Sequence, residues 1–242
     1  MITFLRKLRR SDMTGTGSSF STGRYLKYAL GEIVLVVIGI LIALSINDHS
    51  QYLKDRKKEV YTLQSIKSNL NEDIGLLFKI IYSNQQVLAK LDTASIILSG
   101  ARDWPVYSLT TNLEALIETY HFTTNRTGID QMISSSQMDI IQNRQLTEQL
   151  FLYYRDIEEN TKGNETEVAE YSRITFGPAL LGYDDMSNPK KSLIAYRSDP
   201  LFGNSVSFKQ KAMRLMVAEY LKIQKKAQRL VALMDEELNR LK

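Results

Sequence analysis

Few residues of this sequence could carry out chemistry. Cysteine is absent, which excludes disulfides, thiol nucleophiles and thiolate metal sites. The two histidines, His49 and His121, lie far apart in the sequence and do not form a metal-binding pair. The motifs G-x-G-x-x-G, G-x-x-x-x-G-K-[ST], H-E-x-x-H and G-x-S-x-G do not occur. We therefore predict no catalytic residue, no metal site and no cofactor, and a protein that is not an enzyme.

The remaining candidates have simpler interpretations. Asp184 and Asp185 lie beside Gly182, in a setting where aspartates usually form turns, and contact with a cation or a partner is the alternative. Asp139 lies near predicted helix ends and is interpreted as a helix cap. His121 has aromatic neighbours on both sides and is interpreted as a packed residue.

Three residues in an otherwise apolar segment fall on one side of a helix. At about 100° per residue, Glu32, Gly39 and Ala43 lie within about 40° of one another. Small residues four apart let two membrane helices approach closely, and a carboxylate in lipid is costly unless it faces protein or water. We predict a membrane-helix interface at these three residues. The alternatives are that the small pair is incidental, that Glu32 reaches the lipid headgroups, or that Glu32 carries a proton.

The segment that positions this stripe is a predicted transmembrane helix over residues 24–47. Residues 33–44 contain no polar side chain, and the wider stretch 25–46 is long enough to cross a bilayer. A buried helix of a soluble protein is one alternative, although twelve consecutive apolar residues cover every face. A signal peptide cleaved after 43–45 is another, but a charged leader of about 30 residues is too long for a usual one. We therefore predict a retained anchor.

Basic residues predict how the anchor is oriented. Six Lys or Arg side chains precede the apolar run, and four follow it within residues 54–58. The excess on the N-terminal side places the N-terminus in the cytoplasm and the following domain outside it. We expect three parts: a cytoplasmic leader and linker over 1–23, the transmembrane helix over 24–47, and an extracytoplasmic domain over 48–242. The basic amphipathic stretch 1–10 suits the surface of a lipid bilayer.

Two long helices with heptad spacing are predicted in the outer domain. Residues 52–99 contain no proline and one glycine, and Gly100 is a plausible stop. Residues 208–242 contain neither glycine nor proline. Both segments carry the seven-residue apolar repeat typical of coiled coils, and we expect them to pack as antiparallel partners. In the first segment the predicted core positions are Val60, Leu63, Leu70, Ile74, Leu77, Ile81, Leu88, Leu91 and Leu98, interrupted by Lys67, Asn84 and Ser95.

The segment between these helices is predicted to form shorter helices. Helices are expected over 109–121, 128–136 and 145–159. Residues 175–206 hold three of the four prolines and are expected to form the least regular region, a long loop with short elements. Alternation over 119–124 is too short to build a sheet. The fold class is therefore mainly α, with one N-terminal transmembrane helix and an extracytoplasmic α-helical bundle.

The charge distribution argues against nucleic acid as a partner. The formal net charge is +4 and the pI is near 9.0, but the basic excess belongs to residues 1–31. The aromatic cluster at 151–154 has acidic neighbours at 156, 158 and 159, which suits helix packing better than base stacking.

Two blocks of sequence carry a resemblance. Residues 28–47 (Y-A-L-G-E-I-V-L-V-V-I-G-I-L-I-A-L-S-I-N) and 135–154 (S-S-Q-M-D-I-I-Q-N-R-Q-L-T-E-Q-L-F-L-Y-Y) resemble an uncharacterised family of small single-span envelope proteins, common in Bacteroidetes-type bacteria, which bears a domain-of-unknown-function label. In the second block, Ser136-Gln137 stands where a Ser-Gly pair is more typical of the family. The resemblance implies an inner-membrane anchor with a periplasmic domain and transfers no catalytic residues.

These observations favour a membrane-anchored structural or interaction protein. It would self-associate, or serve as an accessory subunit with partner membrane proteins in an inner-membrane or envelope complex. A single-span signal-transducing subunit is one alternative, although residues 1–23 are too few for an effector domain. A component of an ion-coupled membrane complex using Glu32 is another, and it would need a partner to supply the rest of a proton path.

Overall fold

The computed structural model describes residues 22–102, 104–135 and 138–241. The predicted leader helix over 1–10 and all but the end of the linker over 11–23 lie outside the described residues. The chain divides into two units, Met1–Lys54 and Asp55–Lys242. Helix α2 contributes to both units, and each unit is described by itself.

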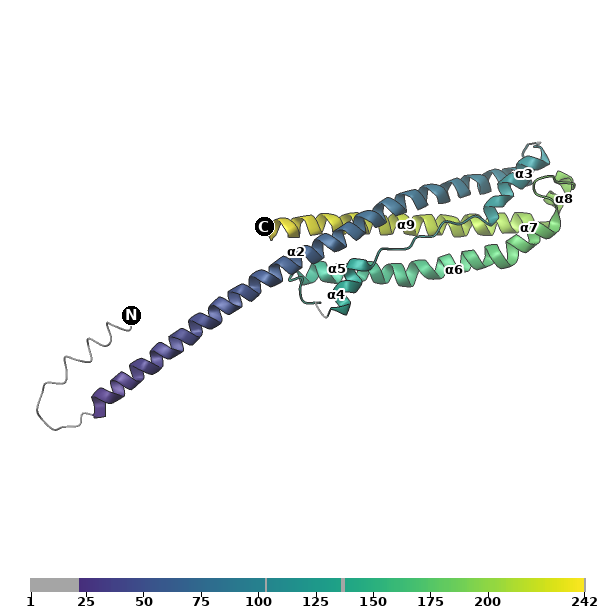
Figure 1. Ribbon diagram of the computed structural model, residues 1–242. Coiled ribbons are helices and arrows are strands. Elements are labelled where there is room, and N and C mark those ends of the chain that lie inside the picture. The colour runs from purple at the N-terminus through teal and green to yellow at the C-terminus, as the bar shows by residue number, and fades with distance from the viewer. Residues whose placement is uncertain (1–21, 103, 136–137, 242) are drawn as a thin grey trace, which may run out of the picture. The chain divides into compact units, whose positions relative to one another are not determined.

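The described residues form helices and connecting segments without a strand, which confirms the mainly α prediction (Figure 1). The elements are α2 (Thr22–Leu98), α3 (Val106–Leu113), the 3₁₀ turn η1 (Glu114–Leu116), α4 (Thr127–Ser134), α5 (Arg144–Asp156), the π-helical η2 (Ile157–Thr161), α6 (Lys162–Glu170), the π-helical η3 (Tyr171–Phe176), α7 (Gly177–Tyr183), α8 (Leu193–Ser198) and α9 (Pro200–Arg240).

Helix α2 ends where the sequence predicts. Its segment 52–98 has no proline, and Gly100 adopts a left-handed conformation with φ of 79° directly after the helix. This conformation suits glycine, which lacks a Cβ, and it turns the chain away from the helix axis. The sole tryptophan, Trp104, follows the turn and packs against the hydrophobic core.

In the second unit, α2 and α9 lie side by side and antiparallel, as predicted (Figure 1). Lys67 of α2 pairs with Asp235 of α9, the Ile74 carbonyl accepts from Gln224 at 3.4 Å, and Asp92 accepts from Arg214 at 2.8 Å. Residue numbers rise along α2 as they fall along α9. The two helices therefore run in opposite directions.

The buried face of α2 repeats with the predicted spacing but lies one row away from part of the predicted core. Buried residues alternate at intervals of three and four along the helix: Leu63, Ile66, Leu70, Asp73, Leu77, Ile80, Asn84, Val87, Leu91 and Ala94. Lys67 and Ser95 appeared as interruptions because their row lies at the edge of the core, where Val60, Ile74 and Leu88 are also only half-buried. Asn84 is a true core position, fully buried.

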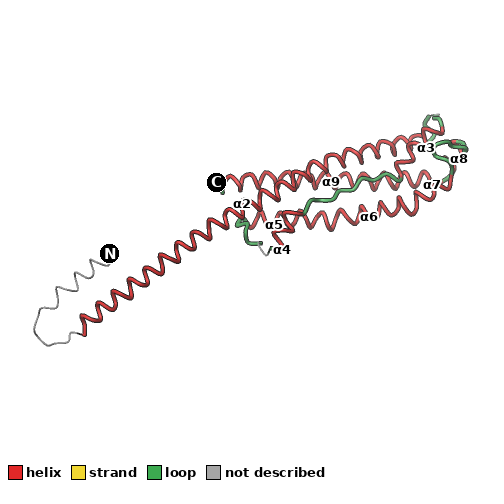
Figure 2. Tube along the Cα trace, in the orientation of Figure 1, coloured by secondary structure: helices red, strands yellow, loops and turns green. Residues whose placement is uncertain are grey.

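The predicted helix over 109–121 is wrong at its C-terminal end. Helix α3 and the turn η1 end at Leu116, and residues 117–126 form an extended segment that runs along the helices (Figure 2). Side chains of neighbouring helices bind the backbone of this segment, which competes with helical hydrogen bonding. The brief alternation of apolar and polar residues over 119–124 therefore corresponds to an extended segment that pairs with no other strand among the described residues.

Residues 144–183 form an almost continuous helical row, α5–η2–α6–η3–α7, in which α6 was not predicted. Two π-helical stretches interrupt it, and each widens the helix locally and changes the face that points to the core. The prediction of a long loop with short elements over 175–206 is confirmed in its short helices and wrong in the length of the loop. Helices α7 and α8 occupy much of it, and only 184–192 remains irregular between them.

Helix α9 begins at Pro200 rather than at 208 because the sequence supplies a cap there. Asp199 accepts a hydrogen bond from the Leu201 N–H at 2.9 Å, and proline suits the first helical position. The prolines of this region predict a loop, whereas Pro200 starts a helix. Helices α2, α3, α4, α5 and α9 all contribute to one hydrophobic core.

Candidate functional site

The apolar segment of α2 is exposed along its whole length. Every residue from 25 to 54 is exposed, and aliphatic side chains such as Val37 and Ile46 are 46% and 67% accessible. Among the described residues, α2 is long and apolar enough to cross a membrane, and none of its most apolar stretch is buried. The alternative of a buried helix in a soluble core does not agree with this exposure, since such a helix would be covered by the rest of the chain.

The three predicted interface residues lie on this exposed segment. Glu32, Gly39 and Ala43 belong to one helix and all three are accessible. A Cβ built at Gly39 would meet nothing within 4 Å among the described atoms. The structure therefore leaves this stripe open to a partner or to lipid, and the interface stays a prediction.

The second unit contains one buried cluster with the residue types of an acid–base site. The Lys209 ammonium is fully buried and donates hydrogen bonds to Thr119 Oγ1 at 2.7 Å and to Ser172 Oγ at 2.8 Å. Burial lowers the pKa of Lys209 to about 8, and the nearby Glu118 carboxylate opposes that shift. The π-helical stretch η3 carries Ser172, and α9 carries Lys209.

The hydrogen bonds of this cluster run in the wrong direction for a nucleophile. A serine nucleophile gives its proton to a base, whereas Ser172 Oγ accepts from Lys209 and lies 2.9 Å from the Val168 carbonyl, to which it donates. Lys209 is 0% exposed and Ser172 is 6% exposed, so a substrate could not reach them. The cluster is structural: it fastens η3 and the extended segment 117–126 to α9.

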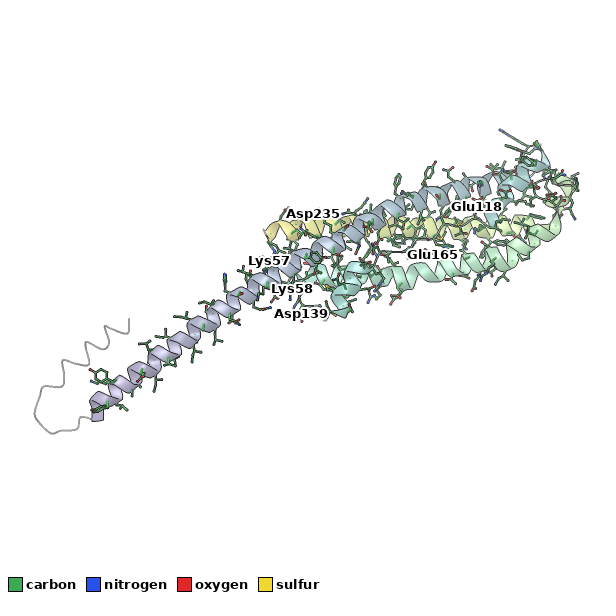
Figure 3. All side chains as sticks on the ribbon, viewed as in Figure 1. Lys57, Lys58, Glu118, Asp139, Glu165 and Asp235 are labelled. Carbon is green, nitrogen blue, oxygen red and sulfur yellow. The ribbon has the colours of Figure 1, made fainter. Side chains whose placement is uncertain are left out.

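Other buried polar groups fasten the same extended segment. Glu165, labelled on α6 in Figure 3, accepts from the Tyr220 hydroxyl, and its Oε1 lies 3.4 Å from the Phe122 backbone nitrogen. Asn84 of α2 donates to the Tyr120 carbonyl at 2.8 Å and accepts from the Tyr120 N–H at 3.1 Å. The contacts with Tyr120 and Phe122 satisfy backbone groups that a helix or sheet would otherwise pair.

Asp73 holds the end of the extended segment. Its carboxylate accepts from the Asn125 N–H at 2.8 Å, from the Tyr153 hydroxyl at 3.3 Å and from the Thr124 hydroxyl. Burial raises the pKa of Asp73, while these hydrogen bonds work in the opposite direction by stabilising the carboxylate. Sequence inspection missed this group because a single aspartate inside an apolar heptad has no motif.

Two of the simpler interpretations are wrong in detail. His121 is not packed: its side chain is 37% exposed, with Nδ1 3.9 Å from Glu165 Oε2. Asp139 is not the cap of the following helix, because Asn143 caps α5 by accepting from the Leu146 N–H at 3.1 Å.

The turn interpretation of Asp184 and Asp185 is confirmed. Asp184 accepts from the backbone N–H groups of Lys191 and Lys190 at 2.8 and 3.0 Å and from the Tyr196 hydroxyl at 2.9 Å. Partial burial opposes ionisation, but these hydrogen bonds outweigh it and lower the pKa of Asp184 to about 2. The pair closes the loop between α7 and α8.

Two surface hollows could accommodate a ligand, but their linings lack the residues of an acid–base site. One, of about 350 Å³, lies between α2 and α4, and Lys57 and Lys58 are on its α2 wall (Figure 3). Another lies over α9 beside Lys211 and Arg214. Neither lining includes a carboxylate or a histidine, so neither supplies an acid–base pair. Within the described part of the chain, no group of three or more His, Asp or Glu side chains could hold a metal ion.

Comparison with known proteins gives one match. The sequence model of a family described as "Family of unknown function (DUF6090)" matches residues 32–147, just under half of the chain. This range includes most of the first block of the expected resemblance and the beginning of the second. The resemblance to a family with an unknown-function label is confirmed to that extent. No curated protein and no solved structure matches the chain.

Proposed function

We propose that this chain is a single-span membrane protein whose helical domain, a bundle on the far side of the membrane, serves assembly rather than catalysis. The observation that carries the proposal is the apolar segment of α2, which is long enough to cross a bilayer and is exposed on every face. Such a surface is stable in lipid and costly in water. The basic residues before the segment favour a cytoplasmic N-terminus, and the family resemblance favours a bacterial inner membrane with the domain in the periplasm.

The lack of reactive geometry supports an assembly role. In the described residues, every buried carboxylate and ammonium group binds backbone or side-chain groups of the same chain; these groups are Glu59, Asp73, Glu165, Lys209 and Glu237. They hold the fold and are not presented to a ligand. The chain would therefore act by self-association or as an accessory subunit of an inner-membrane or envelope complex.

The contact within the membrane is expected at Glu32, Gly39 and Ala43. Gly39→Ile places a branched side chain where two helix backbones would touch, whereas Val37→Ile gives the same final side chain on another face and adds only one methylene group. Two differently tagged copies extracted in mild detergent should co-purify with Val37→Ile and lose recovery with Gly39→Ile. Glu32→Gln should keep recovery if the carboxylate acts through hydrogen bonds.

The same preparation distinguishes the two forms of the proposal. The mass of the intact complex shows whether the chain associates with itself or with other membrane subunits. Equal recovery of Gly39→Ile and Val37→Ile would show that the stripe is not an interface and would leave α2 as a plain anchor.

A further inference from the structure

The outer face of α2 in the second unit has an unusual composition for a surface exposed to water. The row opposite the core repeats every seven residues and consists of Tyr61, Ser68, Gly75, Tyr82, Ala89 and Ile96, here called the outer seam. All six residues are exposed and none is charged. Tyr61, Tyr82 and Ile96 are 66%, 60% and 49% accessible, and Phe78 beside the seam is 69% accessible.

Helix α9 provides an internal comparison. It also buries residues at alternating intervals of three and four, and the row opposite its core consists of Lys211, Ala218, Lys225, Ala232 and Asn239. That row includes two lysines, as expected for a solvated helix face, whereas the α2 seam has no charged residue. Both rows have charged neighbours: Lys222 and Arg229 lie next to the α9 row, and Glu72 and Lys79 lie next to the α2 seam. The α2 seam, on a partner helix of the same fold, has tyrosines, isoleucine and small residues in the equivalent places.

Gly75 is a second and independent observation. It lies in the interior of a long helix, where glycine costs about 0.5–1 kcal/mol relative to alanine. A Cβ built at Gly75 meets nothing within 4 Å, so no contact among the described residues requires the glycine. A close approach by another backbone from outside would require it, as at other small-residue helix contacts.

We infer that the outer seam of α2 is the surface on which a second copy of this chain docks, helix against helix and parallel. The inference rests on the proposed membrane anchor, which would hold both copies in the same orientation and confine them to one plane. In a parallel pair the two Tyr82 side chains meet at one layer, and the small layers of Gly75 and Ala89 on either side leave room for the rings to turn along the helix axis. The seven-residue repeat is the spacing that lets two helices stay in contact over several turns.

The size of the seam predicts a weak contact that depends on the anchor. From Tyr61 to Ile96 the helix rises about 53 Å at about 1.5 Å per residue, and a contact strip roughly 10 Å wide would cover about 500 Å² of each copy. The total of about 1,000 Å² is at the lower limit of specific interfaces. Confinement of both copies to one membrane raises their local concentration and makes such a contact sufficient.

Disulfide formation in the full-length chain in native membranes tests the inference, because the natural sequence has no cysteine. Ala89→Cys places a thiol on the seam, and Ala218→Cys places one at the matched exposed position of α9. Identical seam positions of a parallel pair lie within disulfide range, so oxidation should give several-fold more covalent dimer with Ala89→Cys. Adding Tyr82→Lys to Ala89→Cys should reduce that dimer by introducing like charges into the contact.

A third single-cysteine variant separates this inference from the membrane contact. Ala43→Cys reports on the predicted stripe within the bilayer. Dimer from Ala43→Cys without dimer from Ala89→Cys would overturn the seam and leave the membrane interface in place. Equal dimer from Ala89→Cys and Ala218→Cys would show random collision and would also overturn it. Dimer from Ala89→Cys that Tyr82→Lys leaves unchanged would mean that the thiols meet by another route.

Discussion

Replacement of Lys209 by methionine should stabilise the protein near neutral pH. The ammonium of Lys209 is fully buried and has two hydroxyl partners but no hydrogen-bonded carboxylate. A pKa of about 8 in the fold against an ordinary value of 10.5 corresponds to a penalty of about 3 kcal/mol at pH 7 for keeping the charge buried. Methionine has a similar volume and carries no charge, and replacement of a buried ion by an apolar side chain is often stabilising.

The net gain is smaller than the charge penalty. Methionine gives up two hydrogen bonds, each contributing about 0.5–1.5 kcal/mol. The hydroxyl partners keep other acceptors, because Thr119 Oγ1 lies 2.7 Å from the Glu118 carbonyl and Ser172 Oγ lies 2.9 Å from the Val168 carbonyl. We expect Lys209→Met to raise the free energy of unfolding by about 1–2 kcal/mol at pH 7.

The lowered pKa of Lys209 also predicts how the free energy of unfolding changes with pH. Between pH 8 and 10.5 the unfolded chain keeps a proton on Lys209 that the folded chain has lost, so stability rises with pH in this window. The wild-type chain should gain about 2 kcal/mol between pH 7 and 9.5 from this group, and Lys209→Met should lack that gain. Lys211→Met, at an exposed position on the same helix, should show neither effect.

Urea unfolding of the full chain in mild detergent measures both quantities. Trp104 is the sole tryptophan and packs on the core of the second unit, so its fluorescence reports on that unit. Tyrosines also ionise at higher pH and change the free energy of unfolding. Because both chains have the same tyrosines, this contribution cancels when the free energy of unfolding of Lys209→Met is compared with that of wild type at the same pH. A variant less stable than wild type by more than about 1 kcal/mol, with a pH-independent difference, would refute the reasoning and show that the charged lysine stabilises the fold.

Two further predictions use the same unfolding assay. Asn84→Ala should destabilise by about 1–3 kcal/mol because it removes the fully buried side chain that pairs the N–H and the carbonyl of Tyr120. The exposed neighbour Gln85→Ala should cost little, and a small effect at both sites would mean that water replaces Asn84. Gly128→Ala should destabilise by about 1–3 kcal/mol because a Cβ there would lie 3.1 Å from the Ile66 backbone nitrogen and 2.9 Å from Asn69 Oδ1. The control Gly203→Ala, in open space within α9, should be neutral or stabilising. Equal effects of the two substitutions would show that the α2–α4 contact is looser than in the structure.

The long helices could be predicted because local and tertiary preferences agree in them. Residues 52–98 have an apolar repeat, no proline and a terminal glycine, and each of these signals favours the same helix. The phase of the core was partly misjudged because the apolar stripe is wide. A row at its edge, with Val60, Ile74 and Leu88, resembles a core row until the partner helix is known.

The middle of the chain could not be predicted because its conformation depends on distant side chains. No proline or glycine within 117–126 ends the helix after Leu116, and the alternation over 119–124 is too short to predict an extended segment by itself. Asn84, Asp73 and Glu165, from helices elsewhere in the sequence, bind this segment and hold it extended. The buried site around Lys209 was missed for the same reason, since Thr119, Ser172 and Lys209 meet only in the folded chain.

The most direct test of the proposed anchor is the accessibility of single cysteines in intact bacterial cells stripped of their outer membrane. Ser207→Cys lies at an exposed position of α9, whereas Ser205 is buried and unsuitable, and Ser18→Cys lies before the apolar segment, outside the described residues. A membrane-impermeant thiol reagent should label the Ser207→Cys chain in intact spheroplasts and the Ser18→Cys chain only after lysis. Labelling of both chains only after lysis, or of Ser18→Cys alone in intact spheroplasts, would contradict a periplasmic domain held by one span.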